Sequence, residues 1–365
     1  MAKKNLIVGQ SGGPTAVINS SLYGVVSEGL AHSDEIGHVY GMINGIEGFL
    51  AGRILDFEEA LPGEKLSYLK HTPGAYLGSC RYKLPESLED PVYPELFRKF
   101  EEMNIGWFFY IGGNDSMDTV SKLSRYAAKV GSSIRVIGEP KTIDNDLVGT
   151  DVSFGFQSAV DIATNTIDCI HTTAASHSRV FIVELMGHKT GWLTLHAGIA
   201  GGSDVILIPE IPYDLDKVVE AINKRINDKK HFTILAVAEG IISKEEMLYS
   251  KKELKEVRKK EHYPSAAYRI GAGIMDRTGQ EVRVTVPGHV QRGGSPCAYD
   301  RVLASRLGAK AAELIMNKEY GYMVCVRNNQ IDKIELNKVA GRLKTVDPQA
   351  GIITEAKAMG ICFGD

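Results

Sequence analysis

The chain has 365 residues, of which 44% are hydrophobic and 24% are charged, and its formal net charge is −3. This composition is ordinary for a globular protein, and the length allows two or three domains. The small net charge provides no basic footprint for nucleic acid, so any anion site must be a local cluster of basic residues.

The N-terminus leads straight into an apolar, strand-like segment and lacks the apolar run and cleavage site of a signal peptide. The sequence contains no run of about 18 apolar residues that would predict a membrane-spanning helix. The five scattered cysteines form no C-x-x-C pair, which favours a reduced chain over disulfides or structural zinc. We therefore expect a cytoplasmic protein with no membrane partner and no nucleic-acid partner.

Short apolar segments alternate with helix-like stretches along the chain. The expected strands are residues 5–9, 107–111, 134–138, 180–185, 205–208, 233–237 and 281–286. The expected helices are residues 16–30, 117–130, 156–174, 213–227 and 266–278, and the Lys- and Glu-rich stretch 250–261 predicts a solvated helix. Residues 322–326 and 331–334 flank Asn328-Asn329-Gln330 and predict a late hairpin. The repeated strand–helix order predicts an α/β fold with largely parallel sheets.

Glycine-rich turns follow two of the expected strands. Gly12-Gly13 comes after the first strand, and Gly112-Gly113 comes after the strand at 107–111. Glycine lets backbone N–H groups approach a phosphate, and the N-terminus of the following helix favours an anion. About half of such turns are only tight connections, so the pattern is weak alone. The P-loop pattern and G-x-G-x-x-G are both absent, which disfavours a P-loop kinase and a dinucleotide-binding dehydrogenase.

A more specific signal is Pro140-Lys141-Thr142-Ile143-Asp144-Asn145-Asp146, which directly follows the strand at 134–138. The ordinary interpretation is an Asx-rich turn that caps a helix. The basic residues Arg179, Arg283, His289 and Arg292 lie downstream and favour another interpretation. A carboxylate that can accept a hydroxyl proton, near cations that bind phosphates, is typical of phosphoryl transfer.

These motifs resemble the phosphofructokinase family across nearly the whole chain and in the family's order. Besides Gly12-Gly13 and the carboxylate loop at 140–146, the matching segments are residues 77–81, 111–116, 176–179, 183–187, 202–210 and 287–296. The resemblance implies two Rossmann-like three-layer α/β domains with mostly parallel sheets, the phosphofructokinase fold. Residues 1–155 with roughly 291–345 would bind the phosphoryl donor, and residues 156–290 with roughly 346–365 would bind the sugar phosphate.

The resemblance also implies a role for each matching residue. Asp144 would take the proton of the sugar 1-hydroxyl as general base, with Thr142, Asp146 and Lys141 as further catalytic residues. The implied donor-binding residues are Gly12, Gly13, Arg81, Gly113, Asn114, Asp115, Ser116 and Lys141. The implied substrate-binding residues are Thr142, Asp144, Arg179, Met186, Gly187, His188, Glu239, Arg283, His289 and Arg292. Mg²⁺ is the implied cofactor, with Asn114, Asp115 and Asp146 as its ligands.

The resemblance implies partners as well: fructose 6-phosphate as acceptor and, by two positions, pyrophosphate as donor. Family members that use ATP carry glycine at the positions of Asp115 and Lys141. An aspartate there would repel the α-phosphate of a nucleotide, and a lysine would add a cation near the transferred or leaving phosphate. Arginines at the positions of Arg179 and Arg283 reach into a neighbouring subunit in this family. We therefore expect a dimer or tetramer with active sites at the subunit interface, acting in glycolysis or gluconeogenesis.

Two departures from the family's pattern keep alternatives open. Asn114 replaces the usual aspartate of the metal site, and His188 replaces an arginine that contacts phosphates. An ATP-dependent 6-phosphofructokinase is one alternative, and a non-catalytic regulatory subunit that senses sugar phosphates is another. The presence of Asp144 favours an enzyme, since a sensor needs the sugar clamp but no base. Sedoheptulose 7-phosphate offers the same reacting end and stays open as a second acceptor.

Overall fold

The computed structural model describes residues 3–177 and 179–365. Met1, Ala2 and Ser178, the last of which belongs to the motif at 176–179, lie outside the described residues. The chain divides into two compact units: a first unit of Met1–Ser158 and Arg292–Leu343, and a second unit of Ala159–Gln291 and Lys344–Asp365. Helix α6 (Phe156–Ala174) begins at the end of the first unit and continues in the second. The α/β fold with mostly parallel sheets is confirmed.

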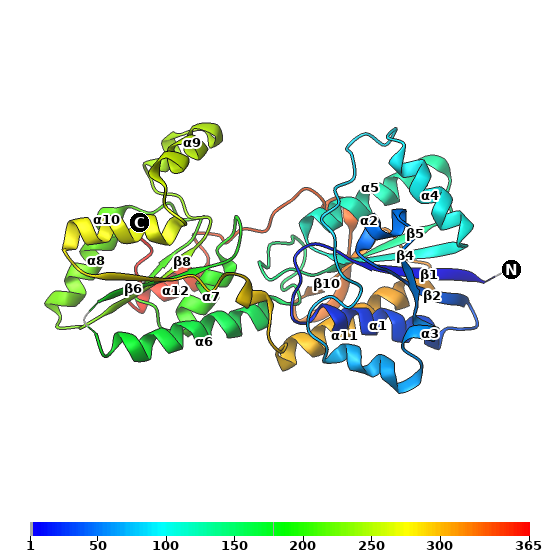
Figure 1. Ribbon diagram of the computed structural model, residues 1–365, viewed down its shortest axis with the longest axis horizontal. Coiled ribbons are helices and arrows are strands. Elements are labelled where there is room, and N and C mark those ends of the chain that lie inside the picture. Colours follow the sequence, from blue (N-terminus) through cyan, green and yellow to red (C-terminus); the bar gives the residue numbers. More distant parts are fainter. Residues whose placement is uncertain (1–2, 178) are drawn as a thin grey trace. The chain divides into compact units, whose positions relative to one another are not determined.

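The first unit is built on a mixed sheet in which most strands are parallel (Figure 1). In sheet order its strands are β11 (Gln330–Glu335), β10 (Tyr322–Arg327), β5 (Arg135–Pro140), β4 (Ile105–Gly112), β1 (Lys4–Gln10), β2 (Ile36–Met42) and β3 (Ile54–Asp56). The two edge strands, β11 and β3, run antiparallel to their neighbours. Because β1, β4 and β5 are parallel neighbours, the turns that follow them meet at one edge of the sheet.

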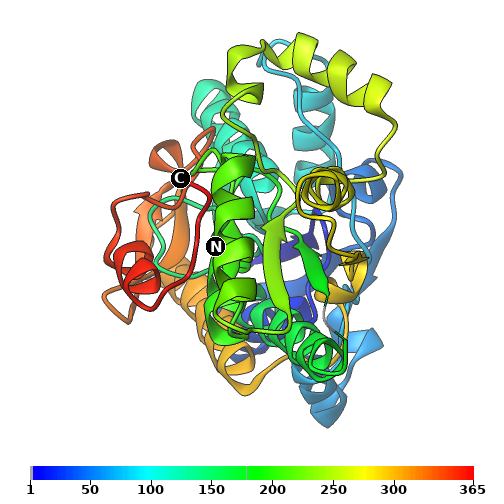
Figure 2. The same ribbon diagram turned by 90° about the vertical axis from the view of Figure 1, so that its left-hand side faces the viewer.

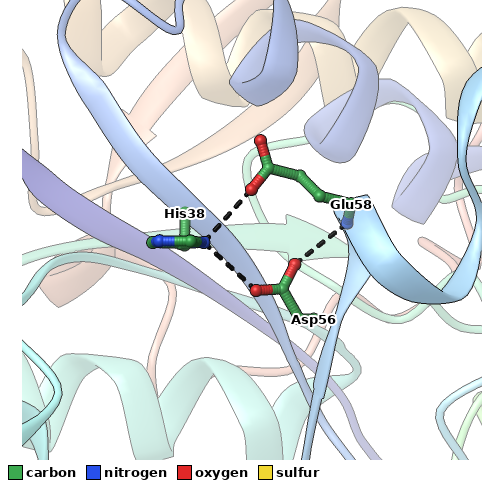
Figure 3. A group of neighbouring side chains, drawn as sticks. All are labelled: His38, Asp56 and Glu58. Atoms are coloured by element: carbon green, nitrogen blue, oxygen red, sulfur yellow. Dashed lines mark hydrogen bonds and ion pairs between the residues drawn. The ribbon is translucent and has the colours of Figure 1, made fainter.

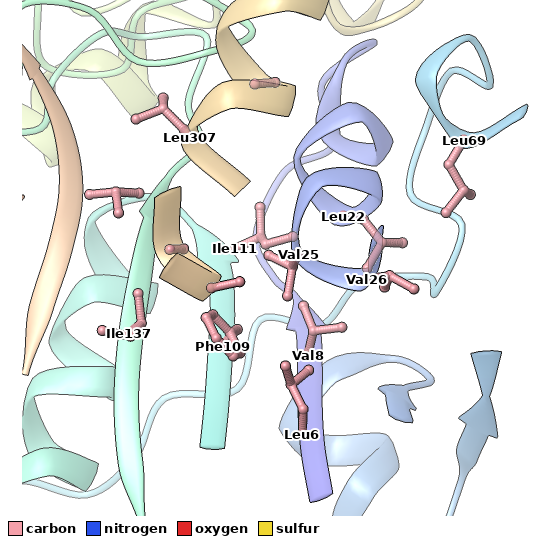
Figure 4. Close-up of a cluster of buried hydrophobic side chains, with 14 of the residues drawn as sticks. Leu6, Val8, Leu22, Val25, Val26, Leu69, Phe109, Ile111, Ile137 and Leu307 are labelled. Carbon is pink, nitrogen blue, oxygen red and sulfur yellow. The ribbon is translucent and has the colours of Figure 1, made fainter. Parts of the chain in front are cut away.

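Helices cover both faces of this sheet. Helices α1 (Ile18–Ala31) and α11 (Ala298–Met316) lie on one face, while α2 (Gly45–Leu50), α4 (Val92–Glu102) and α5 (Asn114–Val130) lie on the other (Figure 1). The unit is completed by α3 (Phe57–Ala60), η1 (Gly63–Lys70) and η4 (Leu336–Lys338). Figure 4 shows Leu22 and Val25 of α1 packed with Val8 of β1. These apolar residues recur at helical and strand spacing, which is why they fold into a layered core.

The glycines of α1 and α11 let these two helices approach closely. A Cβ on Gly24 would lie 2.4 Å from the carbonyl oxygen of Ser305, and one on Gly308 would lie 2.1 Å from that of Ser21. No real Cβ tolerates such distances, so alanine at either position would push the helices apart. This packing fixes α1, which directly follows the Gly12-Gly13 turn.

The second unit has a sheet of parallel strands in the order β7 (Val205–Leu207), β8 (Thr233–Ala238), β6 (Val180–Leu185), β9 (Val282–Thr285). Helices α8 (Leu215–Asn227) and α10 (Ala266–Thr278) pack on one face, and α6 with α7 (Trp192–Ala200) packs on the other. Residues after α12 (Gly351–Ala358) bridge to β7 through Cys362. The η2 (Glu246–Leu248) and α9 (Lys251–Glu261) elements precede α10, and α9 stands away from it in Figures 1 and 2.

Two features of the fold bear on the sequence predictions. Helix α5 begins at Asn114 and not at Met117, because Asn114, Asp115 and Ser116 form its first turn. The predicted loop Gly113–Ser116 is therefore a helix N-terminus. Among the described residues, no helix is both long and apolar enough to cross a membrane.

Candidate active site

The first phosphate-binding turn predicted from sequence is tied to the segment at 77–81. Gly12 donates its N–H to the carbonyl oxygen of Cys80 at 2.9 Å, and the Ser79 hydroxyl donates to the carbonyl oxygen of Gly12 at 2.6 Å. Gly12 has a φ of +78°, which an L side chain adopts only under strain. The structure therefore brings Gly12 and Gly13 next to Arg81, which follows Cys80 in the chain.

Lys141 lies buried beside this turn. Only 2% of the residue is exposed, and its ammonium donates a hydrogen bond to the carbonyl oxygen of Gly13 at 2.6 Å. A Cβ on Gly12 would lie 3.2 Å from the same Nζ. Burial, followed by the positive charge of Arg292, lowers the pKa of Lys141 to about 7, although Asp144 acts in the opposite direction. This lysine is poised to gain charge when an anion binds.

Arg292 also lies against the glycine turn. A Cβ on Gly13 would lie 2.8 Å from Cζ of Arg292, so this position requires glycine while the guanidinium stays where it is. The sequence predicted that Arg292 clamps the sugar phosphate. The structure brings it together with the donor turn of the first unit, and its role at the 6-phosphate stays a prediction.

The carboxylate loop after β5 is held by its own hydrogen bonds. The N–H of Asp144 donates to the Thr142 hydroxyl at 3.0 Å, and the hydroxyl of Ser153 donates to the carbonyl oxygen of Thr142 at 3.0 Å. Asn145, with a φ of +52°, accepts the N–H of Ser153 at 3.0 Å. The next helix, α6, begins only at Phe156, so the Asp144–Asp146 turn is not the helix cap that the ordinary interpretation requires.

The first turn of α5 contributes oxygen atoms beside this loop. Asn114 donates from Nδ2 to the carbonyl oxygen of Asp146 at 3.5 Å. Within the described residues, the buried Oδ1 of Asn114 has no hydrogen-bond partner. Asp115 points outward, with 72% of its side chain exposed, and pairs with Lys83 at 3.0 Å. An orphaned amide oxygen next to the buried Asp146 fits the oxygen ligands that Mg²⁺ takes, whereas Asp115 is directed elsewhere.

In the second unit, the turn after β6 meets the end of β8. The N–H of His188 donates to Oε1 of Glu239 at 2.8 Å, and the N–H of Met186 donates to Oε1 of Gln291 at 3.2 Å. Gly187 has a φ of +149°, and a Cβ there would lie 2.4 Å from the carbonyl oxygen of Thr190. The structure thus brings four predicted sugar contacts together: Met186, Gly187, His188 and Glu239.

The two arginines predicted to act across a subunit interface share one carboxylate. Arg179 and Arg283 both form ion pairs with Glu281, which precedes β9. The pairing of β6 with β9 sets Phe181 opposite Arg283, which explains why Arg179 and Arg283 come close. His289 lies in η3 (Gly288–Arg292), the element that also carries Gln291.

Three residues of these sites were missed by sequence reasoning. Lys83 pairs with Asp115, Glu281 pairs with both arginines, and Gln291 holds the Met186 backbone. Gln291 lies inside the segment at 287–296, so its motif could have indicated it. Lys83 and Glu281 carry no such signal, because their roles depend on tertiary contacts.

A mostly parallel sheet that carries glycine turns, a buried lysine and a carboxylate loop at one edge is typical of an α/β phosphotransferase. The comparisons give the family: the model described as Phosphofructokinase matches residues 5–315. The chain therefore belongs to the phosphofructokinase family. This membership supports phosphofructokinase activity and leaves the phosphoryl donor unspecified.

The relatives differ in the phosphoryl donor that their names carry. An ATP-dependent 6-phosphofructokinase 3 of Bacteroides thetaiotaomicron is 39% identical, over 97% of this chain and 98% of the relative. An ATP-dependent 6-phosphofructokinase of Spirochaeta thermophila is 47% identical, over 74% of this chain and 72% of the relative. Among solved structures, a pyrophosphate-dependent phosphofructokinase from Marinobacter aquaeolei has a TM-score of 0.81 and 32% identity, covering 96% of this chain and 88% of the other. A pyrophosphate-dependent enzyme from Nitrosospira multiformis has a TM-score of 0.83 and 28% identity, covering 95% and 86%.

Proposed function

We propose that the chain transfers a phosphoryl group from pyrophosphate to the 1-hydroxyl of fructose 6-phosphate. The products are fructose 1,6-bisphosphate and phosphate, and the reaction is reversible and Mg²⁺-dependent. The observation that carries the donor assignment is the buried ammonium of Lys141 against the carbonyl oxygen of Gly13. A cation fixed beside a phosphate-binding turn stabilises charge on the transferred or leaving phosphate.

Asp115 supports the same donor. It lies in the first turn of α5, whose N-terminus would otherwise favour an extended polyphosphate chain. Its ion pair with Lys83 joins two exposed side chains, and such pairs contribute little free energy. The carboxylate can therefore leave Lys83 at little cost and repel the α-phosphate of a nucleotide.

The chemistry is a direct in-line transfer without a covalent enzyme intermediate. Asp144 accepts the proton of the 1-hydroxyl while the sugar oxygen bonds to phosphorus and the bridging oxygen of pyrophosphate leaves. Thr142 orients Asp144 through the hydroxyl that accepts the Asp144 N–H. The first unit supplies the donor turns in this proposal, and the second unit supplies the sugar contacts.

Mg²⁺ would be held by Asn114 and Asp146, with Asp115 as the weakest of the three predicted ligands because it is turned toward Lys83. When bound, the ion would neutralise charge on pyrophosphate. Asn114 brings a neutral oxygen where an aspartate would bring a charge, so the ion depends more heavily on the carboxylate of Asp146.

Self-association as a dimer or tetramer belongs to the same proposal, with Arg179 and Arg283 completing the site of a neighbouring subunit. The test mixes two variants, Arg283→Ala and Asp144→Asn, under conditions that exchange subunits, at a fructose 6-phosphate concentration far below the KM of Arg283→Ala, where each variant alone has little activity. If the arginine is supplied by the neighbour, mixed oligomers contain intact sites and activity returns. Activity that stays absent in verified mixed oligomers contradicts the shared site.

An ATP-dependent 6-phosphofructokinase is the second candidate, favoured by the names of the curated relatives. The deciding assay compares pyrophosphate with ATP as donor to fructose 6-phosphate and Mg²⁺. It uses the wild type, Asp115→Gly, Lys141→Gly and the double variant. Lys83→Ala is the control, because it removes the ion-pair partner of Asp115 and leaves Asp115 and Lys141 unchanged.

We expect wild-type turnover with pyrophosphate, and a gain of ATP turnover that is largest in the double variant. The Lys83→Ala control should keep the wild-type donor preference. Wild-type turnover with ATP alone would establish the second candidate. Binding of fructose 6-phosphate without turnover on either donor would identify a sensor.

A further inference from the structure

A cluster outside the active site lies at the β2–β3 edge of the first unit. Strand β2 carries His38, β3 ends at Asp56, and Glu58 lies in α3 directly after it. The antiparallel register pairs Tyr40 with Asp56. His38 is two residues before Tyr40 on β2, so its side chain is directed to the same face as Asp56, and the start of α3 at Phe57 brings Glu58 to His38 as well. Figure 3 shows them converging there.

The convergence is on a single atom. Nδ1 of His38 lies 3.1 Å from Oδ2 of Asp56 and 3.1 Å from Oε2 of Glu58. The three potential ligand atoms lie within 4.8 Å of one another. The other oxygen of Asp56 accepts the N–H of Glu58 at 3.0 Å, which fixes the orientation of this carboxylate. A ring nitrogen carries at most one hydrogen, so a proton satisfies one carboxylate well and the other poorly.

A metal ion would satisfy all three atoms at once. Zinc bonds of about 2.0–2.2 Å in a tetrahedral site set neighbouring ligand atoms about 3.3 Å apart, close to the two 3.1 Å separations from Nδ1 of His38. Imidazole together with carboxylates suits zinc-type cations, whereas Mg²⁺ prefers oxygen ligands alone. The hydrogen bond from the Glu58 N–H to Asp56 holds this carboxylate in place, as metal ligands require.

We propose that His38, Asp56 and Glu58 form a binding site for one zinc-type divalent cation per chain, with the fourth position open to solvent. The site shares no residue with the predicted Mg²⁺ ligands of the active site. Binding joins β2, the short edge strand β3 and α3, so it stabilises this edge of the sheet.

The electrostatic surroundings favour a cation. The ring of Tyr40 stacks on His38 with centroids 5.6 Å apart. The carboxylates of Asp56 and Glu58 face the imidazole from β3 and α3, and a divalent ion would neutralise their charge more completely than a proton.

The test is a calorimetric titration of the chelator-treated, full-length chain with Zn²⁺, together with its melting temperature with and without Zn²⁺. We expect one zinc bound per chain in the wild type and a higher melting temperature in its presence. His38→Gln should lose this binding, and Glu58→Gln, which replaces the charged ligand oxygen by a neutral one, should weaken it. Asp56 is left unchanged because it also caps α3.

His32→Gln is the matched control. His32 is another exposed histidine that pairs with a carboxylate, but it has a single partner, Glu28, at 3.7 Å. Its loss should leave the zinc stoichiometry, affinity and melting shift of the wild type. The free cysteines contribute the same background in every protein compared. Zinc binding that is equal in the wild type and His38→Gln overturns the proposal.

Discussion

The two units differ in how the side chains proposed to bind anions are held. In the first unit, the residues at the strand ends are held before any ligand binds: Lys141 is buried and bonded to the Gly13 backbone, and Asp144 is bonded to Thr142. In the second unit, Arg179 and Arg283 are 30% and 55% exposed and share Glu281 as counter-ion.

This difference separates a preorganised site from one that must rearrange. Fixed donors and cations cost little reorganisation when charge develops, so they serve the chemical step. Arginines already paired with a carboxylate must exchange that partner for a phosphate. Part of their interaction energy with the phosphate is offset by the lost ion pair, and they contribute to substrate binding. Changes in the first unit should therefore lower kcat, and changes in the second should raise KM.

The largest effect is expected from Asp144→Asn. It removes the proposed general base while keeping the shape of the side chain, so kcat should fall about 10²–10⁴-fold. Fructose 6-phosphate binding, measured by calorimetry, should stay within a few-fold of the wild type. A variant with wild-type kcat would refute the role of Asp144.

The orientation of Asp144 is tested by a matched pair of variants at Thr142. Thr142→Ser keeps the hydroxyl that accepts the Asp144 N–H, and Thr142→Val removes it with little change in volume. We expect kcat to fall in Thr142→Val and to be largely retained in Thr142→Ser. Equal losses in both variants would show that packing of the methyl group, and not the hydrogen bond, matters at this position.

The second unit is probed by Arg283→Ala. A charge-assisted hydrogen bond contributes about 1.5–3 kcal/mol, so the KM for fructose 6-phosphate should rise roughly 10–150-fold while kcat changes little. Arg277→Ala is the matched control, since Arg277 is another exposed arginine of this unit and pairs with Asp216 at 2.7 Å. A loss of kcat equal to the rise in KM would place Arg283 in the chemical step and break the contrast between the units.

The sequence predicted the parts of each unit that depend on local pattern. The buried runs of β1, β4 and β5 and the apolar spacing of α5 were recognised, as was the α/β order. Strand β2 was not, because Gly37, His38 and Gly41 interrupt its apolar pattern. Helices α4, α7, α11 and α12 were also not predicted, and α7 is too short and too uniformly apolar to show a helical period.

The residues of the candidate site also divide into those that local pattern predicts and those that depend on tertiary contacts. Residues within one motif, such as Thr142 and Asp144, could be grouped from sequence because they share a loop. The partners of Asp115, Arg179 and Arg283 could not, because Lys83 and Glu281 meet them only through the fold. The position of Arg292 against Gly13 likewise depends on how distant segments pack.

A smaller effect concerns pH and Lys141. Its pKa of about 7 lies below the usual 10.5, so in the free enzyme the ammonium loses its proton as the pH rises through 7. The kcat/KM for pyrophosphate should therefore fall between pH 6 and 8, by up to about tenfold per unit above pH 7. Lys141→Arg keeps its charge over this range and should show a flatter profile in the same buffers. Parallel profiles would exclude Lys141 as the titrating group.

The last expected effect is on stability, at Glu139 of the first unit. Glu139 is fully buried at the end of β5, just before the carboxylate loop, and bonds to Ser21. Burial raises its pKa from 4.5 to about 8, so between these values the folded chain holds a proton that the unfolded chain has released. The free energy of unfolding should accordingly fall as the pH rises from 4.5 to 8. Glu139→Gln has no proton to release, so its free energy of unfolding should depend less on pH over this range. The measurement is chemical denaturation of both proteins at a series of pH values. A slope unchanged from the wild type would mean that Glu139 is not the group that couples the stability of this unit to pH.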